Sequence, residues 1–199
     1  MTPIDDSEIQ KIVQRVLNQV MGTPATVVPP ESSMNVAKEA QVPDIKTGGR
    51  KIVAIGADHG GFELKETLKN ELSGMGYDVN DVGTYGKAAV DYPDYAHEVA
   101  KLVSVGKAWR GIMIDGAGIG SCIVANKVPG VRAGMAYDYS SAVNSREHND
   151  TNVLTLGAGL IGVNLAKQIV KTWLSTEFGG DRHLRRVEKI TKVEKLYFK

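Results

Sequence analysis

Two kinds of periodicity divide the chain into an N-terminal segment, a segment without a pattern and a longer region of alternating elements. In residues 1–21 apolar side chains recur three or four positions apart, which predicts one stripe of an amphipathic helix. The stripe consists of Ile9, Ile12, Val13, Val16, Leu17, Val20 and Met21. Residues 22–49 are rich in Pro, Ser, Thr and Ala without either period, and this composition predicts a flexible linker.

From Lys51 onward, short β-branched runs alternate with stretches of helical spacing. Five runs have the length and composition of strands: 51–57, 77–83, 110–116, 130–136 and 151–157. Short strands interleaved with helices are typical of a parallel sheet that is covered by helices on both faces. We therefore expect an α/β fold with a five-stranded parallel sheet, followed by a basic helix over 181–198.

Composition argues against some kinds of binding partner and indicates the cellular compartment of the protein. The net charge of +1 and the lack of a basic run argue against a nucleic-acid-binding protein. No apolar run approaches the roughly 20 residues of a membrane-spanning helix, and residues 1–21 lack the apolar core of a secretory signal. The single cysteine, Cys122, excludes an internal disulfide framework and fits a reducing compartment. We expect a cytoplasmic protein without a nucleic-acid or membrane partner.

A glycine-rich segment, Gly116-x-Gly118-x-Gly120, follows the third predicted strand. Backbone N–H groups at such a strand–loop–helix junction can bind a phosphate or another oxyanion. A dinucleotide site would instead place G-x-G-x-x-G in the first strand–helix unit, with an acidic residue about 20 positions further on. Spacing and position both differ here, so we do not expect a dinucleotide cofactor.

Polar residues that could act on a ligand gather at three other points: Asp58 with His59, His148 with Asn149, and Arg182 with His183 and Arg186. The first pair follows the first predicted strand, at the edge where α/β sheets bind their ligands. Asp58 could alternatively serve only to cap the next helix. The spacing of the histidines and of the single cysteine fits no metal site, so no metal is expected.

Six segments, in order along the chain, resemble the type B ribose-5-phosphate isomerases: ADHGGFELK, DYPDYA, DGAGIG, ANKVPGVRAG, SREHNDTNVLTLGAGLIG and GGDRHLRRVE. That family also includes the galactose-6-phosphate isomerase subunits. The resemblance covers residues 51–190. It implies a Rossmann-like three-layer sandwich and a homodimer, or a dimer of dimers, whose active sites combine residues of two subunits.

The activity that the resemblance implies is an aldose–ketose isomerisation that needs neither metal nor cofactor. Ribose 5-phosphate would be converted to ribulose 5-phosphate through an enediolate. Two alternatives stay open: a galactose-6-phosphate-type isomerase of hexose phosphates, and a non-catalytic sugar-phosphate-binding protein. Isomerisation requires a group that opens the sugar ring, a base for carbon, an oxyanion site and a phosphate anchor.

Matching this sequence to the family motifs gives most of these roles a residue. His148 matches the group that opens the ring, assisted by Asp58. The phosphate-binding positions match His59, Arg182 and Arg186, and arginine suits phosphate because its forked guanidinium group holds two oxygens. The loop whose N–H groups face the enediolate, and the position that contacts sugar hydroxyls, correspond to Gly116, Ala117, Gly118, Ile119, Gly120 and Asn149.

The carbon base is where the chain departs from the family pattern. Many members have cysteine at the position of Asp115 and threonine at that of Ala117. The galactose-6-phosphate isomerase subunits resemble this chain in carrying aspartate there. We therefore predict that Asp115 is the carbon base, although a carboxylate is a weaker base than a thiolate. Cys122 lies on the helix side of the loop, does not match the cysteine base and is expected to be a buried small residue.

Ordinary members of the family begin near the first strand, so residues 1–49 are an addition. A helix on a Pro- and Ala-rich tether resembles the encapsulation peptides that carry enzymes into bacterial microcompartments. We therefore expect residues 1–21 to dock on a shell protein or a co-packaged enzyme inside such a compartment, and residues 50–199 to form the isomerase domain. Alternatively, the helix could fold back on that domain or on a dimer partner.

Overall fold

The computed structural model describes residues 50–198 and, in the segment before them, Lys11 alone. The predicted linker over 22–49, and the predicted helix over 1–21 apart from Lys11, lie outside the described residues. Within 50–198 the chain alternates between strands and helices, as the hydrophobic pattern predicts.

A five-stranded sheet forms the centre of the domain, and its strands run in the order β2-β1-β3-β5-β4. All four strand pairs are parallel, which confirms the predicted sheet. The strands are β1 (Ile52–Ala57), β2 (Asp78–Asp81), β3 (Arg110–Asp115), β4 (Ala133–Met135) and β5 (Val153–Gly157).

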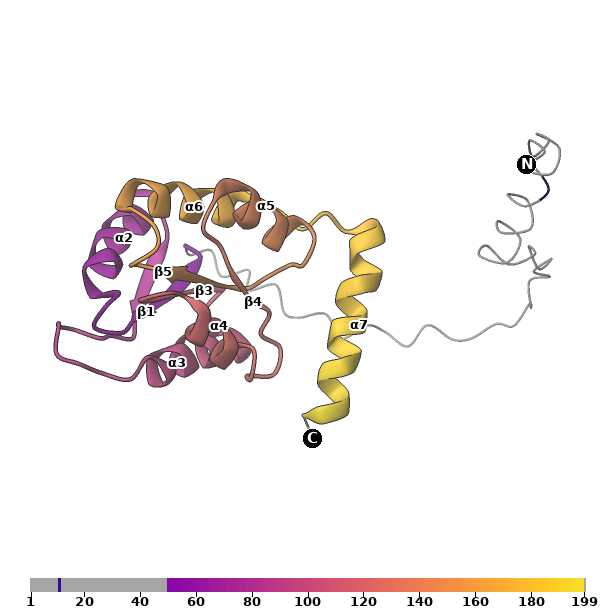
Figure 1. Cartoon of the computed structure of the whole chain (residues 1–199), viewed down its shortest axis with the longest axis horizontal. Helices are drawn as coiled ribbons and strands as arrows, with labels where there is room; N and C mark the ends of the chain where they lie inside the picture. Colours follow the sequence, from indigo (N-terminus) through magenta and orange to yellow (C-terminus); the bar gives the residue numbers. More distant parts are fainter. Residues whose placement is uncertain (1–10, 12–49, 199) are drawn as a thin grey trace, which may run out of the picture. The chain divides into compact units, whose positions relative to one another are not determined.

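Helices cover both faces of the sheet and make three layers (Figure 1). One face carries α2 (Phe62–Gly74), α5 (Tyr139–Glu147) and α6 (Val163–Ser175). The other face carries α3 (Tyr92–Ser104) and α4 (Ile119–Ala125). The last helix, α7 (Asp181–Tyr197), stands beside the β4 edge of the sheet (Figure 1). Within residues 50–198, no helix is both long and apolar enough to span a bilayer.

Because both faces are covered, the central strands are buried along their length. All six residues of β3 are buried, as are the last five of β1, which explains why these runs are nearly continuous in apolar residues. Leu68 of α2 and Trp173 of α6 pack into the core on one face, while Val99 of α3 packs on the other. Burying one such side chain stabilises the fold by about 2 kcal/mol.

Arg110 at the start of β3 ties the sheet to the end of α6. Its Nη1 donates to the carbonyl oxygens of Trp173 at 2.9 Å and Leu174 at 3.0 Å. These carbonyls belong to the last turn of α6, where no intrahelical donor remains for them. Burial lowers the pKa of Arg110 to about 10, so the guanidinium group still carries its charge at neutral pH.

The segment before α6 differs from the expected pattern. Apolar spacing predicts helical structure from Gly159, yet α6 begins at Val163. The preceding residues turn back on the glycine-rich loop, with Ala158 N donating to Asp115 O at 2.8 Å and Gly159 N to Gly116 O at 2.9 Å. Tertiary hydrogen bonds therefore override the local helical preference, and they join the loops that follow β3 and β5.

The strand order places a crevice between β1 and β3. From β1 the chain passes first to β2 on one side and then to β3 on the other. The crossover helices α2 and α3 consequently lie on opposite faces of the sheet. In folds of this kind the ligand binds where the winding reverses, outside the carboxyl ends of the strands.

Candidate active site

Two carboxylates lie side by side at the carboxyl ends of β1 and β3. Ala57 pairs with Ile114 in the sheet, and Asp58 N donates to Ile114 O at 3.1 Å. Asp58 and Asp115 are the residues that follow on each strand, and only 8% and 4% of their surfaces are exposed. The structure therefore brings both predicted acidic residues to the crevice where the winding reverses.

Asp58 is only partly engaged by its own loop. Its Oδ1 accepts from Gly61 N at 2.9 Å, but Gly61 is the N-cap of α2 and no side chain caps that helix, so Asp58 holds the turn before α2 and the capping role predicted as an alternative is wrong. Gly61 allows this close approach, since a Cβ there would lie 2.4 Å from Ile114 O. Within residues 50–198, Oδ2 of Asp58 accepts no hydrogen bond, so one oxygen remains available to a ligand.

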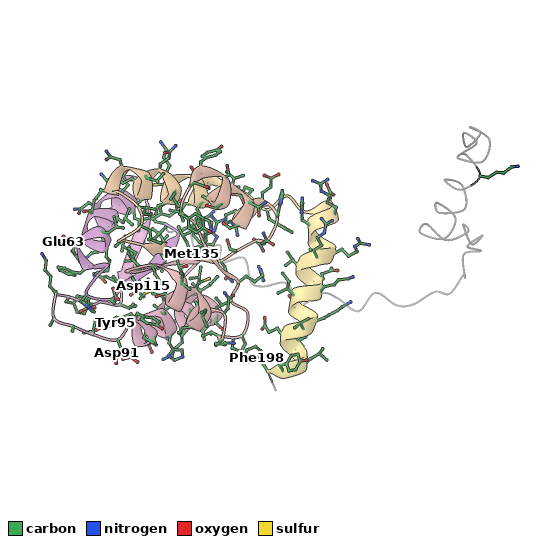
Figure 2. All side chains as sticks on the ribbon, viewed as in Figure 1. Glu63, Asp91, Tyr95, Asp115, Met135 and Phe198 are labelled. Carbon is green, nitrogen blue, oxygen red and sulfur yellow. The ribbon has the colours of Figure 1, made fainter. Side chains whose placement is uncertain are left out.

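Asp115, in contrast, is engaged at both oxygens. Oδ1 accepts from Ala117 N at 2.8 Å and from Gly118 N, while Oδ2 accepts from Ser121 N at 3.1 Å and from Ser121 Oγ at 2.5 Å. A carboxylate offers about four lone-pair sites, so the loop occupies all of them. Gly118 makes the turn possible because its φ is +80° and a Cβ would press on the backbone of β5. Figure 2 marks Asp115 within the body of the domain.

The glycine-rich loop keeps some of its donors free. Ala117 and Gly118 point their N–H groups at Asp115. The N–H groups of Gly116, Ile119 and Gly120 donate to no acceptor among the described residues. These three donors are the part of the predicted loop that could bind an oxyanion.

His59 lies beside this loop and is exposed. Its Nδ1 is 3.2 Å from Val90 O and 3.3 Å from Val90 N, so the segment before α3 holds the imidazole ring. Asp58, His59 and residues 116–120 thus form one cluster, which we call the carboxyl-edge cluster.

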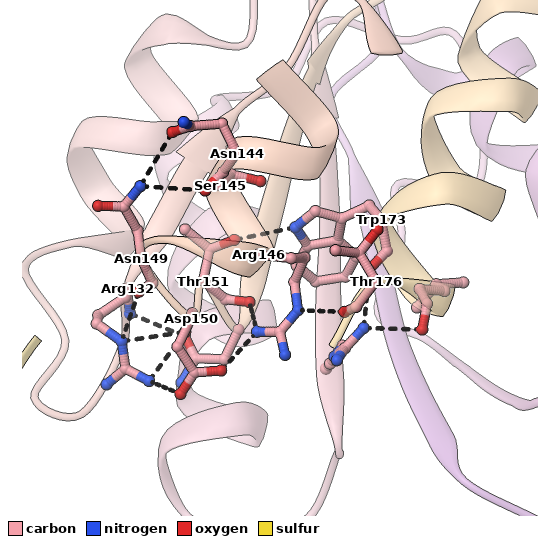
Figure 3. Close-up of polar contacts among 12 residues, drawn as sticks. Arg132, Asn144, Ser145, Arg146, Asn149, Asp150, Thr151, Trp173 and Thr176 are labelled. Atoms are coloured by element: carbon pink, nitrogen blue, oxygen red, sulfur yellow. Dashed lines mark hydrogen bonds and ion pairs between the residues drawn. The ribbon is translucent and has the colours of Figure 1, made fainter. Parts of the chain in front are cut away.

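His148 and Asn149 lie at the other end of the domain, where α5 stops. His148 Nδ1 is 2.8 Å from Asn144 Nδ2. Figure 3 shows the neighbouring contact, in which Asn149 Nδ2 donates to Asn144 Oδ1 at 3.3 Å. The next residue, Asp150, has a φ of +47° and accepts from Arg146 Nη1 at 2.8 Å and Arg132 Nη2 at 2.7 Å (Figure 3). These two ion pairs fix the turn that presents His148 and Asn149.

The start of α7 joins this second cluster. The ring of His183 stacks on that of His148, with 4.1 Å between centroids and 13° between planes. Arg182 Nε donates to His183 Nε2 at 3.2 Å. Arg182 and Arg186 are exposed, lie one turn apart on the helix and form no ion pair within residues 50–198. We call His148, Asn149, Arg182, His183 and Arg186 the amino-edge cluster.

His183 is a candidate site residue to which sequence analysis gave no role. The resemblance assigned the arginines on either side of it, and a stacking contact between residues so distant in sequence cannot be seen in hydrophobic periodicity. The one available signal was its position between Arg182 and Arg186, in a chain with only four histidines.

Burial lowers the pKa of His183 first, and the charges of His148, Arg182 and Arg186 lower it further, against an opposing effect of Glu147. Between this pKa and the ordinary histidine value of about 6.5, the unfolded state binds more protons than the folded state. The contribution of His183 to stability is therefore fully present above about pH 6.5 and is lost as the pH falls. We therefore expect His183→Phe, which keeps an aromatic stack, to reduce the fall in melting temperature between pH 7.5 and 5.5. Thermal denaturation checks this; exposed His97→Phe is the control, and an unchanged slope in His183→Phe would contradict the assignment.

The two clusters lie at opposite ends of the parallel strands, one at the carboxyl ends and the other at the amino ends. Helix α5 begins after the carboxyl end of β4 and returns, so His148 precedes the amino end of β5. In the β3–β5 register Asp115 is level with Gly157, whereas Val153 marks the amino end. Four strand residues at about 3.3 Å each separate these levels by about 13 Å. The structure thus gathers Asp58, His59, Asp115 and the loop, but it does not bring His148, Asn149, Arg182 and Arg186 to them.

Exposed apolar side chains lie on the helices next to both clusters. Ile119 and Ile123 project from α4 beside the carboxyl-edge loop, and Leu184 and Val193 project from α7, all about half exposed. Next to the amino-edge cluster is a cavity of about 590 Å³ between β4, α5 and α7, with Met135, Asn149 and Ile190 among its lining residues.

Neither a metal-binding group nor a reactive thiol is found among the described residues. Among the described residues, no group of three or more His, Cys, Asp and Glu side chains is arranged to hold a metal ion. Cys122 is half-buried, and burial raises the pKa of its thiol, so it is a poor source of thiolate.

Residues 53–190 match the protein family described as Ribose/Galactose Isomerase. Ribose-5-phosphate isomerase B of Escherichia coli K12 is 46% identical over 144 residues, which cover 72% of this chain and 97% of that protein. D-erythrulose-4-phosphate isomerase of Pectobacterium atrosepticum is 44% identical over 144 residues, or 71% of this chain and 94% of that protein. A solved structure of ribose-5-phosphate isomerase B from Clostridium thermocellum has a TM-score of 0.72 and 49% identity, covering 73% of this chain and 99% of its own.

Proposed function

The chain belongs to the ribose/galactose isomerase family, and on that basis we propose that it interconverts ribose 5-phosphate and ribulose 5-phosphate through an enediolate. The observation that carries the proposal is the carboxyl-edge cluster at the β1–β3 crevice. There a nearly buried carboxylate with one available oxygen, Asp58, stands beside a loop with available N–H donors.

Ring opening, stabilisation of the enediolate and binding of the sugar phosphate each have chemical groups suited to them. His148 and Asp58 open the sugar ring by moving the proton between the ring oxygen and the anomeric hydroxyl. The N–H groups of the glycine-rich loop stabilise the negative charge that develops on the enediolate oxygens. His59, Arg182 and Arg186 hold the phosphate, and Asn149 contacts sugar hydroxyls.

The active enzyme is a homodimer in which each site combines the carboxyl-edge cluster of one chain with the amino-edge cluster of the other. The separation of about 13 Å between the two levels supports this, because a five-carbon phosphate cannot be held by both clusters of one chain in the geometry for proton transfer. A two-fold axis builds two equal sites from the two chains.

A second copy of this chain also fits the surfaces that one chain leaves open. In the dimer, α4 of the second copy packs into the cavity beside α7, so that Ile119 and Ile123 meet Met135 and Ile190. This removes exposed apolar side chains from water on both partners and brings the loop ahead of α4 toward the first chain's amino-edge cluster.

Turnover on a panel of phosphates tests the proposal. The purified full chain is assayed with ribose 5-phosphate, erythrose 4-phosphate, and allose and galactose 6-phosphates. Preference for ribose 5-phosphate is expected. Preference for a six-carbon phosphate would place the chain with the galactose-type isomerases, and preference for erythrose 4-phosphate with the relative named for D-erythrulose 4-phosphate. Binding without turnover of any of them would indicate a sugar-phosphate-binding protein.

Residues 1–21 dock the enzyme on a shell protein or a co-packaged enzyme of a bacterial microcompartment, with 22–49 as the tether. The apolar stripe in 1–21 supports this, as does the position of the family match, which begins at residue 53 and leaves the extension outside the catalytic domain. A short amphipathic helix is marginal alone in water and gains stability from a partner groove.

Deleting residues 1–21 is expected to abolish co-localisation with shells and to leave kcat/KM unchanged, because the catalytic residues lie after residue 50. Fluorescence microscopy of tagged chains and steady-state kinetics measure the two effects. Leu17→Glu, within the stripe, should reproduce the deletion, whereas Gln14→Glu, outside it, should not. A loss of turnover on deletion would show instead that the segment packs on the enzyme.

A further inference from the structure

The carbon base is the role for which the geometry and the family resemblance point to different residues. The resemblance selects Asp115, because that residue stands where many family members have a cysteine. In the structure, however, four donors from residues 117–121 surround its carboxylate. To accept a proton from carbon, Asp115 would have to give up at least one of these hydrogen bonds and release part of the loop.

Asp58 could accept a proton from carbon without breaking any hydrogen bond within residues 50–198. It lies next to Asp115 in the sheet register, it is nearly as well buried, and its Oδ2 has no acceptor role within residues 50–198. A Cβ added to Gly60 would lie 3.4 Å from Asp58 Oδ1 and 3.8 Å from Gly116 N, so the Asp58 carboxylate and the loop border the same small space. A substrate carbon in that space would lie beside the Asp58 carboxylate, whose Oδ2 accepts no hydrogen bond within residues 50–198, and beside the N–H donors of the loop.

Given the proposed isomerase activity, on which this assignment rests, we propose that Asp58 moves the carbon-bound proton and that Asp115 is a positioning residue for the glycine-rich loop. Oδ2 of Asp58 takes the proton from C2 of the open-chain aldose. The C2–H electron pair forms the C1–C2 double bond, and the carbonyl π pair moves to O1. The Asp58 carboxyl group then returns its proton to C1, while the O2 proton passes to O1 and the O2–H pair completes the new carbonyl at C2.

Ribulose 5-phosphate separates this role from assistance in ring opening. Its O5 carries the phosphate, so it cannot close a five-membered ring and reaches the enzyme in open form. If Asp58 is the carbon base, Asp58→Asn lowers the rate of ribulose 5-phosphate conversion, and of ribose 5-phosphate conversion, by about 10²–10⁴-fold. If Asp58 only assists ring opening, conversion of ribulose 5-phosphate by the variant stays near the wild-type rate, and the proposal is overturned.

Two further variants test the positioning role of Asp115. Asp115→Asn keeps an acceptor for Ala117 and Gly118, and Ser121→Ala removes the hydroxyl donor to Oδ2 while leaving the carboxylate intact. Both should raise KM for ribulose 5-phosphate and lower kcat by less than about tenfold, well under the effect of removing a general base. A loss of kcat in Asp115→Asn of the size expected for Asp58→Asn, with no fall in Ser121→Ala, would show that Asp115 is the base.

A matched control comes from the start of α5. Asp138 accepts from Ser141 N at 2.6 Å and from Ser141 Oγ at 2.8 Å, an Asp–Ser pair like that of Asp115 and Ser121 but outside both clusters. Asp138→Asn should lower the melting temperature and leave kcat unchanged. A wild-type chain without turnover of either pentose phosphate would refute the proposed function itself, whereas an active wild type with active Asp58→Asn refutes only the assignment of Asp58.

Discussion

An equimolar mixture of Asp58→Asn and His148→Asn chains, unfolded and refolded together, is expected to recover about a quarter of the wild-type turnover, although each variant alone is nearly inactive. Asp58 belongs to the carboxyl-edge cluster and His148 to the amino-edge cluster, which lie at opposite edges of one sheet. In a mixed dimer one site collects both substitutions, and the other receives an intact cluster from each chain. Random pairing makes about half of the dimers mixed, and each has one active site of two.

Turnover of ribose 5-phosphate after refolding, at a fixed total concentration of chains, measures the recovery. Two substitutions from the same cluster, Asp58→Asn and Gly118→Ala, provide the control, because every mixed site would then contain one of them. No recovery in the first mixture, together with wild-type dimer formation, would mean that both clusters serve the same substrate within one chain.

Replacing both Arg182 and Arg186 by alanine is expected to lower kcat/KM for ribose 5-phosphate by about 10²–10⁴-fold. A hydrogen bond to a charged group contributes about 1.5–3 kcal/mol, so two such contacts contribute about 3–6 kcal/mol, and each 1.4 kcal/mol is a factor of ten. Both guanidinium groups are exposed and form no ion pair within the part of the chain that the structure describes, so the double substitution breaks no ion pair there and removes one hydrogen bond, from Arg182 Nε to His183 Nε2.

Steady-state kinetics with ribose 5-phosphate and with unphosphorylated ribose checks the origin of that effect. The loss should be confined to the phosphorylated substrate, because the arginines are proposed to bind only its phosphate. Arg185→Ala removes the same charge from the position before Arg186, which points about 100° away from Arg186 and about 60° away from Arg182 around the helix, and should keep most of the activity. An equal loss in Arg185→Ala would attribute the effect to net charge or to helix stability.

Much of the fold could be predicted from the sequence because the strands are short apolar runs and the helices have one apolar stripe. The burial of β3 on both faces is visible in the unbroken run of residues without a polar side chain in 111–114. The strand order is a different matter, since the same periodicity fits any permutation of the five strands. The turn before α6 was also missed, because its hydrogen bonds go to residues of the loop after β3.

The sequence predicts those parts of the site that depend only on where a residue stands relative to the end of a strand. Residues directly after buried strands reach one edge of a parallel sheet, which is why Asp58 and Asp115 could be placed together. Which oxygens remain available depends on how a loop folds around them, and the ring of donors about Asp115 has no signature in the residue types alone. The stacking of His183 on His148 likewise depends on where α7 docks.

Of the residues of helix α7, only His183 and Val187 are buried in the single chain. The same helix carries Arg182 and Arg186, the arginines proposed to bind the phosphate. An isolated helix of this length has little stability in water, so much of the free energy that orders α7 is expected to come from the second subunit. Folding of the helix, association of the chains and formation of the phosphate site are then linked equilibria. Specific activity would fall on dilution, and crowding the enzyme into a small volume would by itself raise the output of each molecule.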